Sequence, residues 1–204
     1  NVGDSLAKQV AEGDKDYYVV ELSSFQLDGM FDFKVDIAVM LNITPDHLDR
    51  YENNFNNYAA AKFRILQNHT KEEHFIYCED DEVIVQLLSE ANYKGIKHPF
   101  SIKKETINGA FIKNEKLSIN TNKLFEMTIQ KLALQGKHNL YNSMASGIAG
   151  RVLDLKKDII RESLTDFKNI EHRLEEVGKV HGITFVNDSK ATNVNSTWYA
   201  LENY

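Results

Sequence analysis

Two carboxylates and one imidazole lie close together in the first quarter of the chain, directly after an apolar run. Asp46, His47 and Asp49 follow residues 37–41, which we expect to form a buried strand that ends near the turn imposed by Pro45. Carboxylate and imidazole groups at the carboxyl end of a strand are suitable ligands for Mg²⁺, Mn²⁺ or Zn²⁺. The same spacing also fits a turn followed by a capped helix, and the pattern alone favours neither interpretation.

A second acidic position, Glu21, lies at the end of another apolar run. We expect this run, residues 17–22, to be a strand as well. Such a glutamate is usually solvated, but parallel neighbouring strands would place Glu21 and His47 at the same edge of the sheet. Lys62 lies in a predicted helix, residues 55–67, and the helical pattern by itself predicts an exposed lysine.

The elements around these residues predict an α/β fold with a mostly parallel sheet flanked by helices. Strands at 74–78 and 96–100 are separated by a helix at 82–91, which is the βαβ rhythm of a parallel sheet. Residues 109–134 alternate apolar and polar side chains around a turn at Asn114-Glu115. This alternation predicts a small antiparallel meander added to the main sheet.

Further polar residues open a helix expected over residues 140–153. Lys137, His138 and Asn139 lie at its N-terminus, where the helix macrodipole favours anions. A simple N-cap by Asn139 explains the same residues equally well. The polar loop at 188–193 follows a predicted hairpin, and such loops hold phosphate or carboxylate groups or cap helices.

We place a domain boundary near residues 168–173. It divides the chain into a domain at residues 1–169 and the truncated start of a second α/β domain at residues 170–204. Both ends read as interrupted helices, so we expect a fragment of a longer protein.

The composition restricts the class of protein. The chain has 204 residues and a net charge of −6, which disfavours a nucleic-acid partner for the chain as a whole. Its single cysteine, Cys78, excludes an internal disulfide and fits a reducing cytoplasm. No apolar run approaches the roughly 18 residues of a membrane span, so we expect no membrane partner.

Four ordered groups of motifs resemble the Mur ligase family. They are ELSSFQL at 21–27, NITPDHLDRY at 42–51 with AAK at 60–62, GKHNLYN at 136–142, and EHRLE at 171–175 with NDSKATN at 187–193. The resemblance implies a P-loop NTPase-like central ATP-binding domain whose phosphate loop, G-x-x-G-K-S/T, would lie upstream of residue 1. Without that loop, we expect this chain alone neither to ligate nor to bind ATP tightly.

The resemblance also implies an activity. A ligase of this family would use ATP to convert the carboxylate of UDP-N-acetylmuramoyl-L-alanine into an acyl phosphate, and the amine of D-glutamate would displace the phosphate. This is a step of peptidoglycan precursor synthesis, implied here for a cytoplasmic monomer. Charge builds on the phosphoryl group during transfer, so the site needs cations, with two Mg²⁺ sites in the family.

The resemblance assigns roles to individual residues. Glu21 and His47 would be Mg²⁺ ligands, and Lys62 matches a lysine that the family carbamylates, which reverses the expectation of a surface charge. Catalytic roles would fall to Lys62, His47 and His138. Further polar residues would border the nucleotide, the phosphates and D-glutamate, namely Asn139, Asn142, Arg173, Asp188, Lys190 and Thr192.

Other classes of protein fit parts of the pattern. A metal-dependent phosphohydrolase would use Glu21, Asp46, His47 and Asp49. That class leaves NDSKATN and Lys62 unexplained. A non-catalytic nucleotide-binding module would retain Arg173 and Asp188 for adenosine. Related ligases add L-alanine or diaminopimelate, or add glutamates to folate. They share the implied fold and ATP chemistry but not the motif ELSSFQL.

Overall fold

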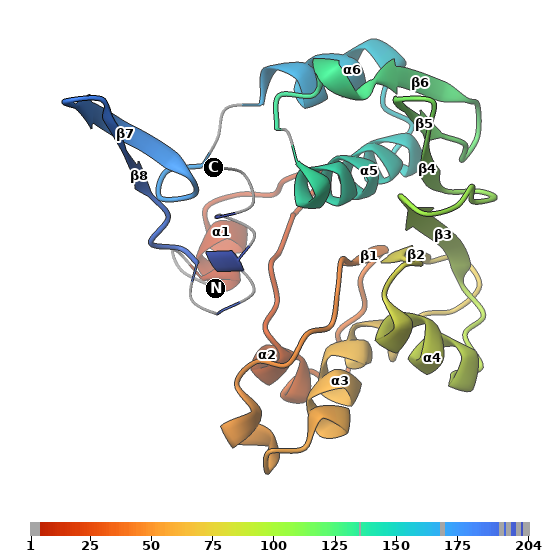
Figure 1. The fold of residues 1–204 in the computed structure, drawn as a ribbon. Coiled ribbons are helices and arrows are strands. Elements are labelled where there is room, and N and C mark those ends of the chain that lie inside the picture. The colour runs from red at the N-terminus through yellow and green to blue at the C-terminus, as the bar shows by residue number, and fades with distance from the viewer. Residues whose placement is uncertain are drawn as a thin grey trace.

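The chain folds around a six-stranded sheet whose spatial order, β1-β2-β3-β4-β5-β6, follows the sequence (Figure 1). The computed structural model describes residues 5–134, 136–167, 170–191, 194, 197–198 and 201. The strands are β1 (Ile37–Met40), β2 (His74–Cys78), β3 (Ile96–Ser101), β4 (Ala110–Lys113), β5 (Lys116–Ile119) and β6 (Phe125–Thr128).

Strands β1 to β4 pair in parallel, and β5 and β6 continue the sheet antiparallel from β4. Ile37 pairs with His74 in the parallel part, and Ala110 pairs with Ile119 where the meander begins. The predicted mostly parallel sheet with an added antiparallel meander is therefore confirmed. The carboxyl ends of β1 to β3 consequently lie at one edge, the edge where ligands bind in open α/β sheets.

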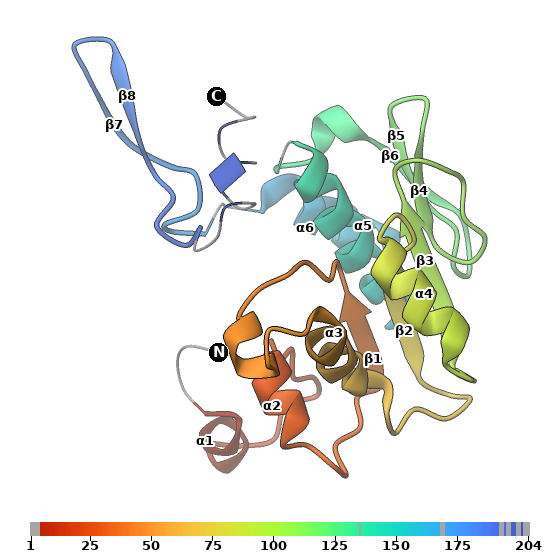
Figure 2. The same ribbon diagram turned by 60° about the horizontal axis from the view of Figure 1, so that its bottom comes forward.

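Helices cover both faces of the sheet (Figures 1 and 2). On one face lie α3 (Phe55–Phe63) and α4 (Glu82–Glu90), with α2 (Ser24–Asp28) beside α3. On the other face lie α5 (Lys137–Val152) and α6 (Lys157–Asp166). Shorter helical elements are α1 (Leu6–Ala11), η1 (Leu48–Tyr51), η2 (Arg64–Leu66) and η3 (Ile129–Lys131). None of the helices described here is long and apolar enough to cross a bilayer.

The core lies on both faces of the sheet, against α3 and α4 on one side and α5 on the other. Phe75 and Phe100 of the central strands are fully buried, and so are Met144 and Ile148 of α5. Small residues in α5 allow this close approach, since a Cβ built on Gly147 would lie 2.4 Å from Ile119 Cδ1. A larger residue at this position would have to displace the buried side chain of Ile119.

Side-chain caps set the starts of several helices. Ser5 Oγ accepts a hydrogen bond from the Lys8 amide at 3.2 Å and so caps α1. By contrast, α5 begins after Gly136, whose φ of 92° favours glycine. Asn139 is therefore the third residue of α5, and its interpretation as the N-cap is wrong.

The expected strand at residues 17–22 is wrong. This segment runs without helix or strand, and Val19 exposes 101% of its reference surface. A strand requires hydrogen bonds to a neighbouring strand, and none of the described strands pairs with this segment. It serves as the extended connection that carries Glu21 into α2.

A separate two-stranded sheet lies near the C-terminal end. It is the predicted hairpin, β7 (Glu175–Val180) and β8 (Ile183–Asn187), with a register shift between Glu176 and Gly178. His181 and Gly182 form its turn with φ values of 50° and 84°. The division into domains at residues 169 and 170 stays a prediction.

Candidate functional site

The loop after β1 carries the first pair of predicted site residues. Residues 41–47 have no helix or strand of their own. His47 ends the loop with a left-handed φ of 49°, directly before η1. Its backbone amide donates to Asp46 Oδ1 at 3.0 Å, and its Nε2 lies 3.8 Å from the same oxygen. The carboxylate of Asp46 thus holds the backbone amide of its neighbour and lies beside the exposed imidazole.

An aromatic cluster contacts the ring of His47. The ring of His47 meets Phe25 of α2 edge-on, with centroids 5.6 Å apart. Phe25 stacks on Tyr51 at 5.8 Å, and Tyr51 contacts Tyr58 of α3 at 5.5 Å. The cluster joins α2, η1 and α3, and His47 contacts it through Phe25.

Lys62 is the second notable group, and the structure overturns the exposed lysine that the helical pattern alone predicts. Its side chain is half-buried, with Nζ 5.3 Å from the centre of the Tyr58 ring. Burial lowers the pKa of Lys62, while the negative charges of Asp46 and Glu21 oppose this and raise it. The structure therefore brings Glu21 and Asp46 within electrostatic range of one amine.

The same carboxylate acts on Tyr58. Burial raises the pKa of Tyr58 to about 12, with a further contribution from the charge of Asp46. Asp46, which the sequence suggested as a metal ligand beside His47 but to which the motifs assigned no role toward α3, is thus the electrostatic link between the β1 loop and α3.

The metal-binding capacity of this corner depends on Lys62. Across the described residues, no three His, Cys, Asp or Glu side chains gather closely enough to hold a metal ion. The donor chemistry nevertheless fits Mg²⁺, because Glu21 and Asp46 are hard oxygen donors whose charges act on one amine. A carbamate on Lys62 would replace that cation by a third oxygen donor.

The first turns of α5 hold the next group of predicted residues. Asn142 Nδ2 donates to Asn139 Oδ1 at 3.5 Å, one turn apart. Tyr141 Oη donates to Asp80 Oδ2 at 2.8 Å, which ties this part of α5 to the carboxyl end of β2. His138 is half-buried at the start of the helix. These residues therefore lie at the same edge of the sheet as the β1 loop.

The C-terminal candidates form a cluster of their own. Asp188 Oδ1 accepts from the Leu174 amide at 3.1 Å, and the Lys190 amide donates to the carbonyl of His172 at 3.2 Å. Arg173 is exposed beside them. Figures 1 and 2 both show this hairpin region apart from α2 and α3, so the structure does not bring it together with Lys62. Thr192 lies outside the described residues.

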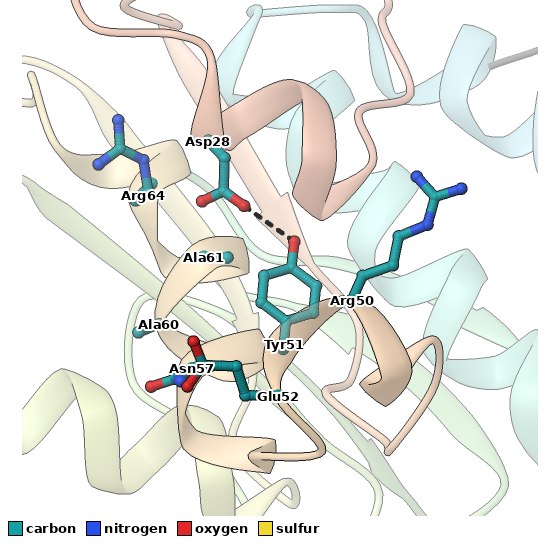
Figure 3. A pocket seen from close by; sticks show the side chains of 8 residues that line it. All are labelled: Asp28, Arg50, Tyr51, Glu52, Asn57, Ala60, Ala61 and Arg64. Carbon is teal, nitrogen blue, oxygen red and sulfur yellow. Dashed lines mark hydrogen bonds between the residues drawn. The ribbon is translucent and has the colours of Figure 1, made fainter.

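A polar pocket that sequence reasoning missed opens on a different face of α3 from Lys62. It has a volume of about 510 Å³ and is shown in Figure 3. Tyr51 Oη donates to Asp28 Oδ2 at 3.0 Å at its wall. The only sequence signal was the helical spacing of three of its residues, Asn57, Ala60 and Arg64. The pocket is lined by Asp28, Arg50, Tyr51, Glu52, Asn57, Ala60, Ala61 and Arg64.

Comparison with known proteins defines the family. The profile of the Mur ligase middle domain matches residues 3–150, and the chain belongs to this family. Solved structures agree at the level of the fold. MurF from Acinetobacter baumannii has a TM-score of 0.63 at 18% identity over 82% of this chain and 36% of that one. MurC from Thermotoga maritima has a TM-score of 0.56 at 18% identity over 89% and 41%.

Sequence relatives narrow the comparison within the family. The chain is 52% identical over 202 residues to a protein of Bacteroides fragilis named UDP-N-acetylmuramoylalanine–D-glutamate ligase, covering 99% of the chain and 46% of that relative. A protein of the same name from Porphyromonas gingivalis is 53% identical over 205 residues, again covering 99% and 46%. The chain thus spans about half the length of these relatives.

Proposed function

We propose that this chain is the central part of an ATP-dependent ligase that adds D-glutamate to UDP-N-acetylmuramoyl-L-alanine through an acyl phosphate, in peptidoglycan precursor synthesis. The observation that carries the proposal is the identity of 52% over 99% of the chain to a relative named for this reaction. The electrostatic corner of Glu21, Asp46 and Lys62 supports it.

The corner suits the first half of such a reaction. Mg²⁺, when bound, would neutralise charge on the phosphoryl group in transit. Glu21 and His47 would hold the ion, and the carboxylate of Asp46 would add negative charge 3.8 Å from Nε2 of His47.

Lys62 would take part as a carbamate. Burial lowers the pKa of Lys62 and so raises the fraction of uncharged amine. The uncharged nitrogen attacks the carbon of CO₂, a C–N bond forms, one C–O π bond opens to an anionic oxygen, and the nitrogen releases a proton to solvent. The product carries a negative charge beside Asp46 and Glu21, and three anions in one corner favour a divalent cation.

The remaining predicted residues would bind substrates. His138, Asn139 and Asn142 lie at the carboxyl edge of the sheet, where the acyl phosphate and nucleotide would be held. The C-terminal hairpin region and the loop after it would supply residues that border ATP and D-glutamate, namely Arg173, Asp188, Lys190 and Thr192. This hairpin group would have to approach the corner for the full reaction.

A product assay on the full-length protein tests the proposal. With ATP, Mg²⁺ and UDP-N-acetylmuramoyl-L-alanine, we expect an amide product by mass spectrometry only when D-glutamate is added. L-alanine and diaminopimelate serve as matched alternative amines. Steady phosphate release that does not depend on D-glutamate would instead indicate a phosphohydrolase, and ATP binding without product would indicate a nucleotide-binding module.

A further inference from the structure

Two adjacent carboxylates, Asp80 and Asp81, follow β2 and connect it to different walls of the candidate site. Asp81 uses both of its oxygens. Oδ1 accepts from the Ile84 amide at 2.9 Å as the N-cap of α4, and Oδ2 accepts from the Ile43 amide at 3.0 Å. One side chain therefore joins the start of α4 to the loop that carries Asp46 and His47.

Ile43 is an effective anchor for that loop. It lies three residues before Asp46 and exposes only 2% of its surface. Its side chain is held in the core, and its amide is held by Asp81. Because residues 41–47 have no secondary structure of their own, this bond limits the positions that Asp46 and His47 can take.

Asp80 connects the other wall. Oδ1 accepts from Ser101 Oγ at 2.7 Å, and Oδ2 accepts from the Ile102 amide at 2.9 Å and from Tyr141 Oη at 2.8 Å. Burial by itself raises the pKa of Asp80, but hydrogen bonds from Ser101, Ile102 and Tyr141 outweigh it and lower the pKa. The carboxylate is thus held charged between β3 and α5.

We propose that Asp80 and Asp81 are positioning residues that fix the distance between the two walls of the site, one wall being the β1 loop with Asp46 and His47, the other the first turns of α5 with His138 and Asn139. This inference rests on the proposed function. The device needs carboxylates, since an asparagine offers one acceptor oxygen and would turn N–H donors toward a backbone amide.

The first experiment measures amide hydrogen exchange of Ile43 by NMR. In Asp81→Asn we expect the Ile43 amide to exchange about tenfold faster than in the wild type, as expected for loss of one hydrogen bond. Glu82→Gln is the matched control. Glu82 is exposed in the first turn of the same helix, and its substitution removes the same negative charge as Asp81→Asn. Unchanged exchange of Ile43 in Asp81→Asn, or an equal increase in Glu82→Gln, would overturn the proposal.

A variant that removes a single hydroxyl separates the positioning effect from a general loss of folding. Tyr141→Phe removes only the hydroxyl that donates to Asp80, and we expect it to shift the side-chain amide resonances of Asn139 and Asn142 while Ile43 stays protected. Resonances of α5 that do not respond would contradict the role of Asp80. This result does not depend on any enzymatic activity.

The second experiment uses the full-length ligase assay. Asp81→Asn should lower kcat by about tenfold while KM for ATP stays within about twofold. Displacement of the loop at residues 41–47 misaligns the reacting groups more than it weakens the binding of nucleotide. Glu82→Gln should match the wild type. Loss of ATP affinity with kcat unchanged would contradict the positioning role. An inactive wild type would contradict the proposed function, but it would not affect the result for the amide hydrogen exchange of Ile43.

Discussion

Lys62 and Tyr58 lie one turn apart on α3, with the lysine Nζ 5.3 Å from the centre of the aromatic ring. The ring shields the amine from water on one side, while Asp46 and Glu21 act on it from other elements. A lysine in this position is neither a free surface charge nor a member of a simple ion pair, because burial lowers its pKa and two acids partly compensate.

Tyr58→Ala tests this relationship. Tyr58 is buried, so we expect its truncation to lower the free energy of unfolding by about 3–5 kcal/mol. Removing the ring also exposes the amine, so the pKa of Lys62 should rise toward its ordinary value of 10.5. Urea unfolding and an NMR titration of the lysine side chain measure the two effects.

Tyr58→Phe is the control for that experiment. It keeps the ring, so stability should change by about 1 kcal/mol or less and the pKa of Lys62 should stay lowered. A lysine pKa that rises equally in both variants would show that the ring does not shield the amine.

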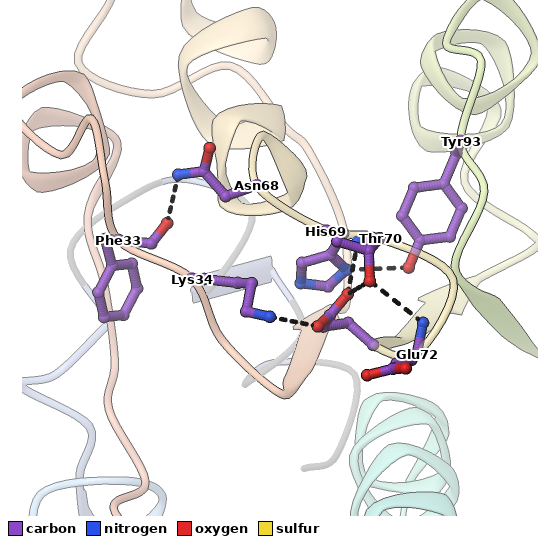
Figure 4. Close-up of polar contacts among 8 residues, drawn as sticks. Phe33, Lys34, Asn68, His69, Thr70, Glu72 and Tyr93 are labelled. Atoms are coloured by element: carbon purple, nitrogen blue, oxygen red, sulfur yellow. Dashed lines mark hydrogen bonds and ion pairs between the residues drawn. The ribbon is translucent and has the colours of Figure 1, made fainter.

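A charged network at the opposite edge of the sheet makes stability depend on acid pH. Glu73 exposes 5% of its surface and accepts from Lys34 Nζ at 2.5 Å and from the amide and hydroxyl of Thr70. Figure 4 labels the donors Lys34 and Thr70. The bond from Lys34, followed by those from Thr70, lowers the pKa of Glu73 to about 2. The folded carboxylate therefore holds its proton less tightly than the unfolded one, whose pKa is 4.5.

The stabilisation from Glu73 is then fully present above pH 4.5 and is lost as the pH falls toward 2. We expect the urea midpoint of Glu73→Gln to lie below that of the wild type at pH 7, and the two midpoints to converge near pH 2. Midpoints that differ equally at both pH values would contradict the linkage.

A histidine pair on β2 and β3 gives a separate dependence near neutral pH. His98 Nδ1 lies 2.9 Å from the carbonyl of Asn108, which can only accept, so Nδ1 carries the proton. The other nitrogen of His98 then accepts from His74 Nδ1 at 2.9 Å. Protonation of His98 would place two N–H groups against each other.

Burial lowers the pKa of His98 below 6.5, opposed by the bond to Asn108 and reinforced by His74. The unfolded chain therefore binds a proton more readily, and stability is present above pH 6.5 and is lost as the pH falls below it. We expect the urea midpoint of the wild type to fall between pH 7.5 and 5.5 (set roughly one pH unit either side of this pKa) more steeply than that of His98→Phe. Parallel curves would exclude this pair as the cause.

The sequence predicts the elements that depend on local pattern. The βαβ run, the meander and the hairpin at β7 and β8 all have a clear period and turn residues. Residues 17–22 have equally strong strand propensity, yet they form no strand, because pairing depends on a distant partner rather than on local sequence.

The site is predicted only in part for the same reason. Motifs identify Glu21, His47 and Lys62 but not the electrostatic role of Asp46, which depends on where the β1 loop meets α3. The bonds of Asp81 to Ile43 and of Tyr141 to Asp80 join residues 38 and 61 positions apart, and no local pattern reveals them. The assigned catalytic and substrate-binding roles stay predictions.

Carbamylation would turn Lys62 into an anionic ligand of a Mg²⁺-holding corner, and ¹³C NMR in labelled bicarbonate tests this proposal most directly. We predict a carbamate resonance in the wild type that grows with pH, shifts when Mg²⁺ is added, and is absent in Lys62→Ala. Lys34→Ala, which removes a lysine whose pKa is raised by Glu73, should keep the resonance. A wild type without the resonance, or a Lys62→Ala variant that retains it, would contradict the account.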